Sequence, residues 1–130
     1  MVVAVKKKKK RNYAESASQR ALFKWISYIP ILNDLSFSIP NAGRRSKITG
    51  YLMRLEGMKA GVPDIFIAFP SSPFHGLFIE MKEKGRKPEP AQIIMMERLT
   101  AQGYKCAVCY TWEEAKNVII TYLNGSLSVK

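Results

Sequence analysis

The sequence predicts a single domain of the α/β class, in which helices flank a mixed β-sheet. The chain has 130 residues, of which 47% are apolar, and this length is enough for one well-packed core but too short for two. Segments with apolar residues at helical spacing alternate with short apolar runs of strand length. Because neither a linker nor an internal repeat interrupts this alternation, we expect one domain over residues 12–124.

The first half of the domain is expected to contain a helix, a strand and a second, shorter helix. Apolar residues recur at helical spacing from residue 12 to about residue 29, and Pro30 ends this helix. Residues 35–39 alternate apolar and polar side chains, as a half-buried strand does. Residues 48–59 show the apolar side of a short helix. That side consists of Tyr51, Leu52 and Leu55.

The centre of the chain has the pattern of a β-hairpin that carries two acids. Two apolar runs, residues 61–69 and 76–82, are separated by Pro and Ser residues that favour a turn. If they pair as an antiparallel hairpin centred on Ser72, Asp64 faces Glu80, with Cβ atoms roughly 4.5–5.5 Å apart. Opposed carboxylates repel and are costly to bury. Because a divalent cation between them removes both objections, the hairpin predicts a metal site.

The second half is expected to add a helix, a strand and a final helix. Pro88-Glu89-Pro90 introduces a helix that ends near residue 102, and Gln92 lies within its apolar arc, where an amide needs a hydrogen-bond partner. Residues 104–110 are apolar on both faces, so this strand is expected inside the sheet. A capping box precedes the last helix. Its core stripe is Ala115, Val118, Ile119 and Tyr122, and residues 125–130 are expected to be a frayed tail.

The charge of the chain favours a polyanionic partner. A formal net charge of +11 points to nucleic acid or an anionic membrane surface. No apolar run is long enough to span a membrane, and the N-terminal one is too short for a signal peptide. We therefore expect an intracellular, cytoplasmic protein that binds DNA or RNA. Residues 1–11 are expected to be a flexible basic arm, which serves either solubility or non-specific phosphate contact.

Two basic loops contain the candidate contacts to nucleic acid. Loops of this composition contact phosphates, although many are simply solvated. The candidates are Arg44, Arg45 and Lys47 in the first loop and Lys84, Arg86 and Lys87 in the second.

The two cysteines do not indicate a metal or redox site. Cys106 and Cys109 form a Cys-x-x-Cys, but no second pair completes a zinc site. Residues three apart on a strand point to opposite faces, so we expect two small, free core thiols.

The acids of the hairpin and a nearby lysine have the composition of a hydrolytic site. Glu80 and Lys82 are two residues apart, so they project from the same face of their strand. Oxygen ligands from Asp64 and Glu80, with the Met81 carbonyl, suit Mg²⁺ or Mn²⁺, and no organic cofactor is expected. The metal would lower the pKa of its bound water, and Lys82 would orient that water. A cross-strand salt bridge is the alternative interpretation of the pattern.

Glu15 has two interpretations. It lies three residues after Asn12, and the pair fits a capping box at the start of the first helix. Alternatively, the Glu15 side chain projects beside the metal site. Spacing alone favours the capping interpretation.

Several short motifs carry a resemblance to a nuclease family. Pro63-Asp64 followed by Glu80-Met81-Lys82 resembles the motif of the PD-(D/E)xK nuclease superfamily. Together with further matches in order along the chain, the series is similar to the VRR-NUC branch over roughly residues 12–123. The matches are Lys59-Ala60-Gly61-Val62-Pro63-Asp64-Ile65, Phe78-Ile79-Glu80-Met81-Lys82, Pro90-Ala91-Gln92 and Gly103-Tyr104.

The resemblance implies a fold and a set of site residues. The implied fold is a restriction endonuclease-like core, a mixed sheet flanked by helices in the order α-β-(α)-β-β-α-β-α. Asp64 and Glu80 are implied to be metal ligands and Lys82 the catalytic lysine. The resemblance also assigns Gln92 to the active site and places Glu15 there, as the acid of the first helix.

The resemblance further implies a substrate and an assembly. Stand-alone, phage-type members suggest a homodimer that cleaves branched DNA such as four-way (Holliday) junctions, in a bacterial or phage-infected host. Ile93, Met95 and Met96 offer more apolar surface than one helix face needs, which indicates an interface. The large accessory regions of eukaryotic members are lacking, so flap processing is not implied. Two alternatives remain open: a nucleic-acid-binding protein without catalytic activity, and a restriction-type or RNA-directed nuclease on the same core.

Overall fold

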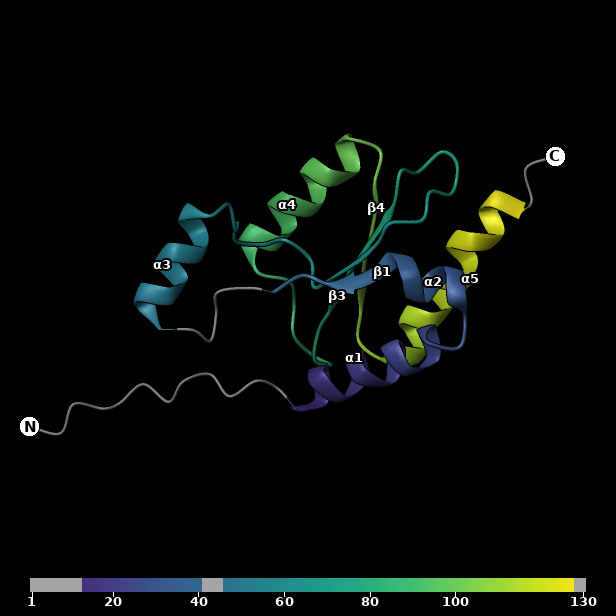
Figure 1. The fold of residues 1–130 in the computed structure, drawn as a ribbon, viewed down its shortest axis with the longest axis horizontal. Helices are drawn as coiled ribbons and strands as arrows, with labels where there is room; N and C mark the ends of the chain where they lie inside the picture. Colours follow the sequence, from purple (N-terminus) through teal and green to yellow (C-terminus); the bar gives the residue numbers. More distant parts are fainter. Residues whose placement is uncertain (1–12, 41–45, 128–130) are drawn as a thin grey trace, which may run out of the picture.

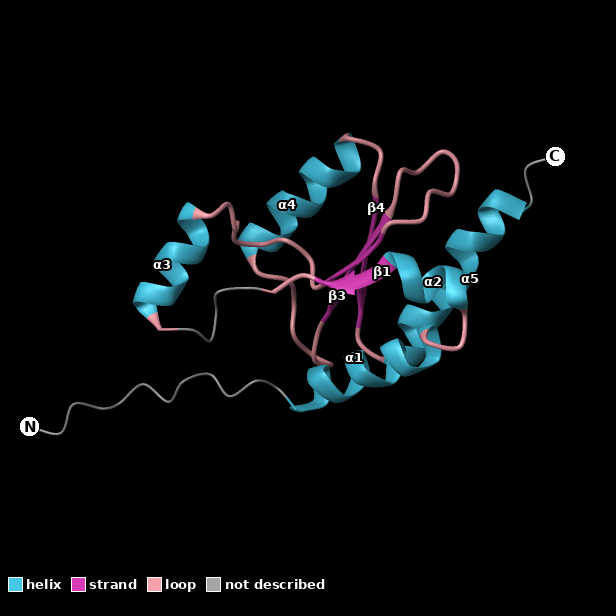
Figure 2. Cartoon of the chain, viewed as in Figure 1, coloured by secondary structure: helices cyan, strands magenta, loops and turns pink. Residues whose placement is uncertain are grey.

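The computed structural model describes residues 13–40 and 46–127, which form a mixed four-stranded sheet with helices on both faces (Figures 1 and 2). The elements are α1 (Tyr13–Ile26), α2 (Pro30–Leu35), β1 (Ser36–Ser38), α3 (Lys47–Leu55), β2 (Ile65–Ile67), β3 (Leu77–Met81), α4 (Pro90–Ala101), β4 (Lys105–Cys109) and α5 (Trp112–Leu127). The strand order is β1-β2-β3-β4. β1 and β2 pair antiparallel, as do β2 and β3, whereas β4 is parallel to β3. The predicted α/β class and mixed sheet are confirmed.

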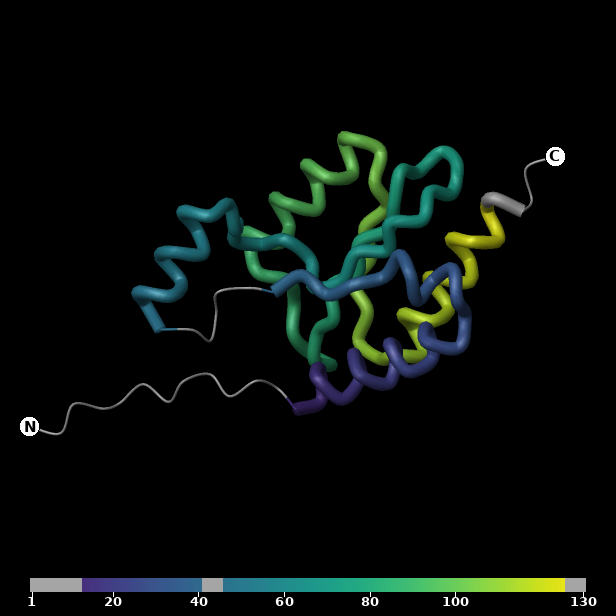
Figure 3. The backbone as a smooth tube through the Cα atoms, viewed as in Figure 1, coloured from purple at the N-terminus to yellow at the C-terminus, as the bar shows by residue number. Residues whose placement is uncertain are grey.

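The core lies between one face of the sheet and helices α1, α2 and α5. α1 and α5 pack together along one side of the sheet (Figure 3). The buried side chains of β2 and β3 belong to the same core cluster as those of these helices. Each large side chain that is fully buried here contributes about 1.5–3 kcal/mol to stability. The core residues are Leu22, Ile26, Leu32, Ile65, Ile67, Leu77, Ile79, Met81, Cys109, Ala115, Ile119 and Tyr122.

The segment between α1 and β2 departs from the prediction in two places. Pro30 was expected only to end a helix, but it also begins α2, at a position where its missing N–H costs no hydrogen bond. The alternation in β1 is opposite to that expected of a buried strand. Ser36 and Ser38 pair with the core residues of β2, while Phe37 is 49% exposed and packs edge-on against Phe66.

β4 lies at the edge of the sheet in the part of the chain that is described, so the expectation of an internal strand was wrong. The strand is apolar on both faces because α4 and α5 cover its two sides. Cys106 faces α4, with its Sγ 3.7 Å from the Met96 carbonyl oxygen, and Cys109 is buried in the core. Both thiols are free, as predicted.

α3 and α4 leave apolar surface uncovered, which the sequence pattern indicated for α4 but not for α3. α3 covers residues 47–55 rather than 48–59, and it stands away from the sheet (Figure 1). Its apolar side is 50–75% exposed and consists of Ile48, Tyr51, Leu52 and Leu55. In α4 no residue is fully buried, so its predicted apolar arc is only half covered.

The described residues do not coincide with the predicted bounds of the domain at either end. α5 continues to Leu127, which is beyond the domain boundary expected at residue 124. The basic arm, Asn12 and residues 128–130 lie outside the described residues.

Candidate active site

The hairpin of β2 and β3 has the register that sets Asp64 opposite Glu80. Ile65 pairs with Ile79, so the next position away from the turn joins the two acids. The register predicted from the sequence is therefore confirmed.

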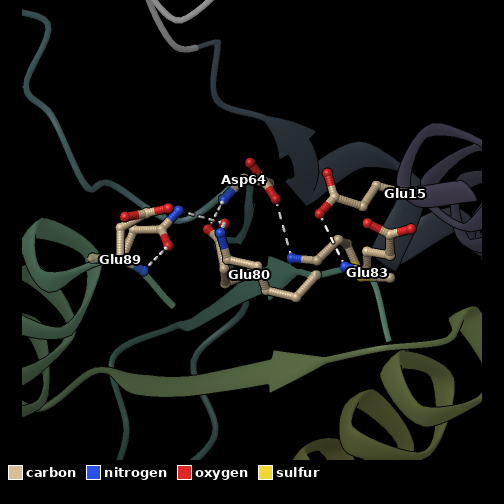
Figure 4. A network of polar contacts seen from close by, with 8 residues as sticks. Glu15, Asp64, Glu80, Glu83 and Glu89 are labelled. Atoms are coloured by element: carbon tan, nitrogen blue, oxygen red, sulfur yellow. Dashed lines mark hydrogen bonds and ion pairs between the residues drawn. The ribbon is translucent and has the colours of Figure 1, made fainter. Parts of the chain in front are cut away.

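Each acid is fixed by a backbone N–H of the opposite segment. The Asp64 N–H donates to Glu80 Oε2 at 3.2 Å, and the Met81 N–H donates to Asp64 Oδ2 at 3.0 Å (Figure 4). Glu80 thus accepts from the backbone of Asp64 itself, and Asp64 accepts from the residue that directly follows Glu80. This reciprocal arrangement makes the two acids converge, as the predicted metal site requires.

Both carboxyl groups have a raised pKa. Glu80 is 2% exposed, and burial, followed by the negative charge of Asp64, raises its pKa to about 8. Burial also raises the pKa of Asp64, and the charge of Glu15 acts in the same direction, against the lowering effect of the Met81 N–H. Because these acids resist ionising side by side, a cation placed between them would be favoured.

Lys82 brings one positive charge to the pair of acids. Its Nζ lies 3.9 Å from Glu80 Oε1, and its side chain is 11% exposed. The charge lowers the pKa of both acids, but burial outweighs it. At this distance the ammonium group is close to the site without being committed to a short hydrogen bond with Glu80.

Gln92 contacts Glu80 from α4. Its Oε1 accepts from the Glu89 N–H at 2.8 Å, and its Nε2 donates to Glu80 Oε1 at 2.7 Å. Because a backbone N–H can only donate, the first bond fixes the amide oxygen, and the amide nitrogen then faces the carboxylate. The partner that the sequence required for Gln92 is therefore Glu80. The role of Glu89 was missed, although its spacing from Gln92 is that of a capping box.

Glu15 reaches the same place from α1. Its Oε1 accepts from the Glu83 N–H at 2.9 Å, and Figure 4 shows its carboxylate facing that of Asp64. Asn12, its partner in the capping interpretation, lies outside the residues that the structure describes. The Glu15 carboxylate thus lies beside the pair of acids, and its part in the active site stays a prediction.

Comparison with known proteins identifies the family of the chain. The family model described as the VRR-NUC domain matches residues 5–112, which is most of the chain. The chain belongs to the VRR-NUC family. This family is of nuclease type, so DNA is the implied class of substrate. No curated protein matches the chain.

Two solved structures resemble this VRR-NUC chain. One named "VRR_NUC domain protein" has a TM-score of 0.76 and 26% sequence identity, and the match covers 86% of this chain and 89% of that one. A second, named "VRR_NUC domain", has a TM-score of 0.56 and 19% identity over 84% of this chain and 97% of the other, which supports the fold alone. Among the helices described here, none has the length and apolar content to cross a membrane.

The donor set of this VRR-NUC site fits a hard divalent cation. Within residues 13–40 and 46–127, no three His, Cys, Asp or Glu side chains are grouped so that they could hold a metal ion. Asp64 and Glu80 with the Met81 carbonyl would supply oxygen donors only, and water would complete the shell. Mg²⁺ binds in this manner, whereas a structural zinc site needs four protein ligands.

The predicted basic contacts of the VRR-NUC chain are only partly described. Arg44 and Arg45 lie outside the described residues. Lys47 is the exposed first residue of α3, and Lys84 and Lys87 are exposed in the loop after β3. Arg86 pairs with Glu83, with Nε and Oε2 3.2 Å apart, so part of its charge is neutralised. Lys84 lies two residues after Lys82, at the edge of the candidate site.

Proposed function

We propose that the protein is a Mg²⁺-dependent DNA endonuclease that acts as a homodimer on branched DNA such as four-way junctions, with Mn²⁺ able to replace Mg²⁺. The observation that carries the proposal is the reciprocal hydrogen bonding of Asp64 and Glu80, with Lys82 beside them. This arrangement keeps two acids together at a place where they are costly to ionise. Uncharged side chains would fill the same space without that cost, so the acids indicate a function that needs their charge.

Asp64, Glu80 and the Met81 carbonyl would hold the metal. When bound, the metal would polarise a phosphoryl oxygen of the DNA and lower the pKa of a bound water. Glu80 keeps one orientation because Gln92 donates to its Oε1 and the Asp64 N–H donates to its Oε2. The chain therefore fixes the carboxylate before a substrate arrives, and this preorganisation favours catalysis.

Lys82 is the proposed catalytic lysine. Its ammonium group would orient the attacking water and stabilise the negative charge that develops on the pentavalent phosphorus centre. The backbone of Lys82 supports this role, because its N–H donates to the Cys109 carbonyl at 2.9 Å and ties the end of β3 to β4. Glu15 adds a third negative charge at the edge of the site.

The remaining basic residues are proposed to bind the DNA backbone. These residues are Arg44, Arg45, Lys47, Lys84, Arg86 and Lys87. Contacts of this kind hold DNA without reading its sequence, and they weaken as salt rises. A preference for branched DNA fits a homodimer, because one site cuts one strand and a symmetrical junction needs two sites related by a two-fold axis.

A cleavage assay tests the proposal. The protein is incubated with linear, nicked, flap and four-way-junction DNA, in Mg²⁺, Mn²⁺ or EDTA. We expect junction cleavage that requires the metal. Asp64→Asn and Lys82→Ala should each reduce the rate by about 100-fold or more, because each removes a group that acts on the transition state, while both variants still bind the junction.

Asp34→Asn is the matched control, since Asp34 is an exposed acid of α2 and should keep full activity. Cleavage that persists in Asp64→Asn would refute the assigned site. Tight binding without any metal-dependent cleavage would favour a non-catalytic binding protein, and cleavage of RNA in preference to DNA would reassign the substrate.

A further inference from the structure

We propose that a hollow between α1 and β1 binds a phosphodiester group of the DNA strand, next to the one that is cut, with Arg20 as its anchor. The hollow has a volume of about 300 Å³ and is lined by Ser16, Gln19, Arg20, Phe23 and Ser38. The inference rests on the proposed nuclease function, and it adds a binding site that lies outside the acid pair and the two basic loops.

The hollow adjoins the candidate active site on two sides. On α1, Ser16 directly follows Glu15, whose carboxylate accepts from the Glu83 N–H. On β1, Ser38 directly precedes Ile39, whose N–H donates to the Asp64 carbonyl at 2.7 Å. The two walls of the hollow are therefore continuous with segments that position acids of the site, so a strand at the acids passes close to it.

The polar groups of the hollow have no partners in the described part of the chain. Arg20 makes no ion pair with a described carboxylate, although acids surround the neighbouring site. The side chains of Ser16, Gln19 and Ser38 likewise make no hydrogen bond with another described residue. An arginine, two hydroxyls and an amide are thus left available to a ligand.

This set of donors suits a phosphate rather than a cation or an apolar ligand. A guanidinium group can donate two parallel hydrogen bonds to phosphate oxygens, and serine and glutamine side chains commonly contact the DNA backbone. The acids at the site repel a polyanion, so an adjacent positive group is needed to hold the strand there. The wall is firm because Leu22 and Ile26 bury the opposite side of α1 in the core.

A binding experiment tests the role of Arg20. Affinity for a four-way junction is measured over a range of salt concentrations with the full chain carrying Asp64→Asn, so that no cleavage occurs. We expect Arg20→Ala to weaken binding about five- to tenfold and to reduce the slope of log affinity against log salt by about 1, the change for one lost phosphate contact. Arg20→Lys should restore part of the affinity.

Arg98→Ala is the matched control, because Arg98 is an exposed arginine in the last turn of α4 and its loss should leave the slope almost unchanged. An equal change of slope in Arg20→Ala and Arg98→Ala would overturn the proposal, since the effect would then come from net charge alone.

A second experiment identifies the ligand as a phosphate. Neutral methylphosphonate groups replace the phosphates on either side of the scissile one, singly. At one of these positions the replacement should weaken binding by the Asp64→Asn protein but not by the Asp64→Asn protein that also carries Arg20→Ala, because there the contact is already lost. Equal losses in both proteins at every position would overturn the inference. A protein that fails to cleave DNA but shows the Arg20 effects would contradict the proposed function while leaving the binding site in place.

Discussion

At Glu80, burial and a neighbouring charge act on the carboxyl group in the same direction. The group is nearly inaccessible, and Asp64 lies opposite it, so its pKa rises to about 8 from the usual value of 4.5. In the unfolded chain both influences disappear. The folded protein therefore holds a proton in a range of pH where the unfolded chain has lost it.

This difference predicts how stability depends on pH in the absence of metal. Because the folded state binds more protons between about pH 5 and pH 8, the free energy of unfolding should fall as pH rises through this window. We expect a loss on the order of 3 kcal/mol in EDTA, measured as a falling Tm. Glu80→Gln cannot ionise and should show a much flatter profile.

Two controls accompany this measurement. Asp34→Asn should keep the slope of the unchanged protein. Mg²⁺ should restore stability near pH 8, because it favours the ionised acids and its binding releases their protons. A Tm that rises between pH 5 and pH 8 in EDTA would contradict the raised pKa.

At the scale of elements, Gly61 brings the segment that precedes β2 into close contact with the start of α4. Its φ is +86°, and a Cβ at this position would lie 2.3 Å from the Ala91 carbonyl oxygen and 3.0 Å from the Gln92 nitrogen. Only a glycine permits this contact. Gly61 lies three residues before Asp64. Its close approach to α4 therefore keeps Gln92 within reach of Glu80, which faces Asp64.

We therefore expect Gly61→Ala to destabilise the protein by about 2–4 kcal/mol, because it combines a strained backbone with a steric clash. Gly85→Ala is the matched control, since Gly85 has a φ of +88° but no atom within 4 Å of the added Cβ, so only the strain remains. Urea unfolding compares the two variants. Equal losses of stability would show that the contact with α4 contributes nothing.

The hairpin could be predicted from the sequence because its determinants are local. Its two strands are separated by a short turn, and a shift by one residue would move the core side chains to the other face. The predicted register came from centring the hairpin on Ser72, and with it came the meeting of Asp64 and Glu80. Gln92 was also found, because an amide on an apolar helix face indicates a nearby partner.

Other features depend on contacts between distant segments, and the sequence did not reveal them. β4 is apolar on both faces because a helix covers each face. A strand in the interior of the sheet has the same apolar pattern, so the sequence alone does not show that β4 lies at the edge. The position of Glu15 depends on how α1 lies against the end of β3. Arg20 was not among the predicted site residues, because only the folded chain brings Ser38 of β1 beside α1 to form the hollow that Arg20 lines.

At the scale of the whole molecule, α3 is the element that the fold leaves uncovered. Its apolar face, formed by Ile48, Tyr51, Leu52 and Leu55, is 50–75% exposed, and the helix lies to one side of the sheet (Figure 1). Apolar side chains gathered on one exposed face mark an interaction surface. α4 offers a second, weaker candidate, because Ile93 is also exposed.

This surface leads to a prediction about assembly. We expect sedimentation at micromolar concentrations to give about twice the chain mass of 14.8 kDa, with α3 at the interface. Leu52→Lys should then yield the monomer, because it places a charge where the two copies would bury apolar surface. Ile120→Lys on α5 is the control, since Ile120 is exposed but outside both candidate faces.

The same variants connect assembly to the reaction. If two sites must act on one junction, the monomeric Leu52→Lys should still nick one strand but lose paired cleavage of two strands. Dissociation by Ile93→Lys instead would move the interface to α4, where the sequence first indicated it. A chain that remains at 14.8 kDa throughout the concentration range would contradict the homodimer, and the single site described here would then have to cut each strand in a separate encounter.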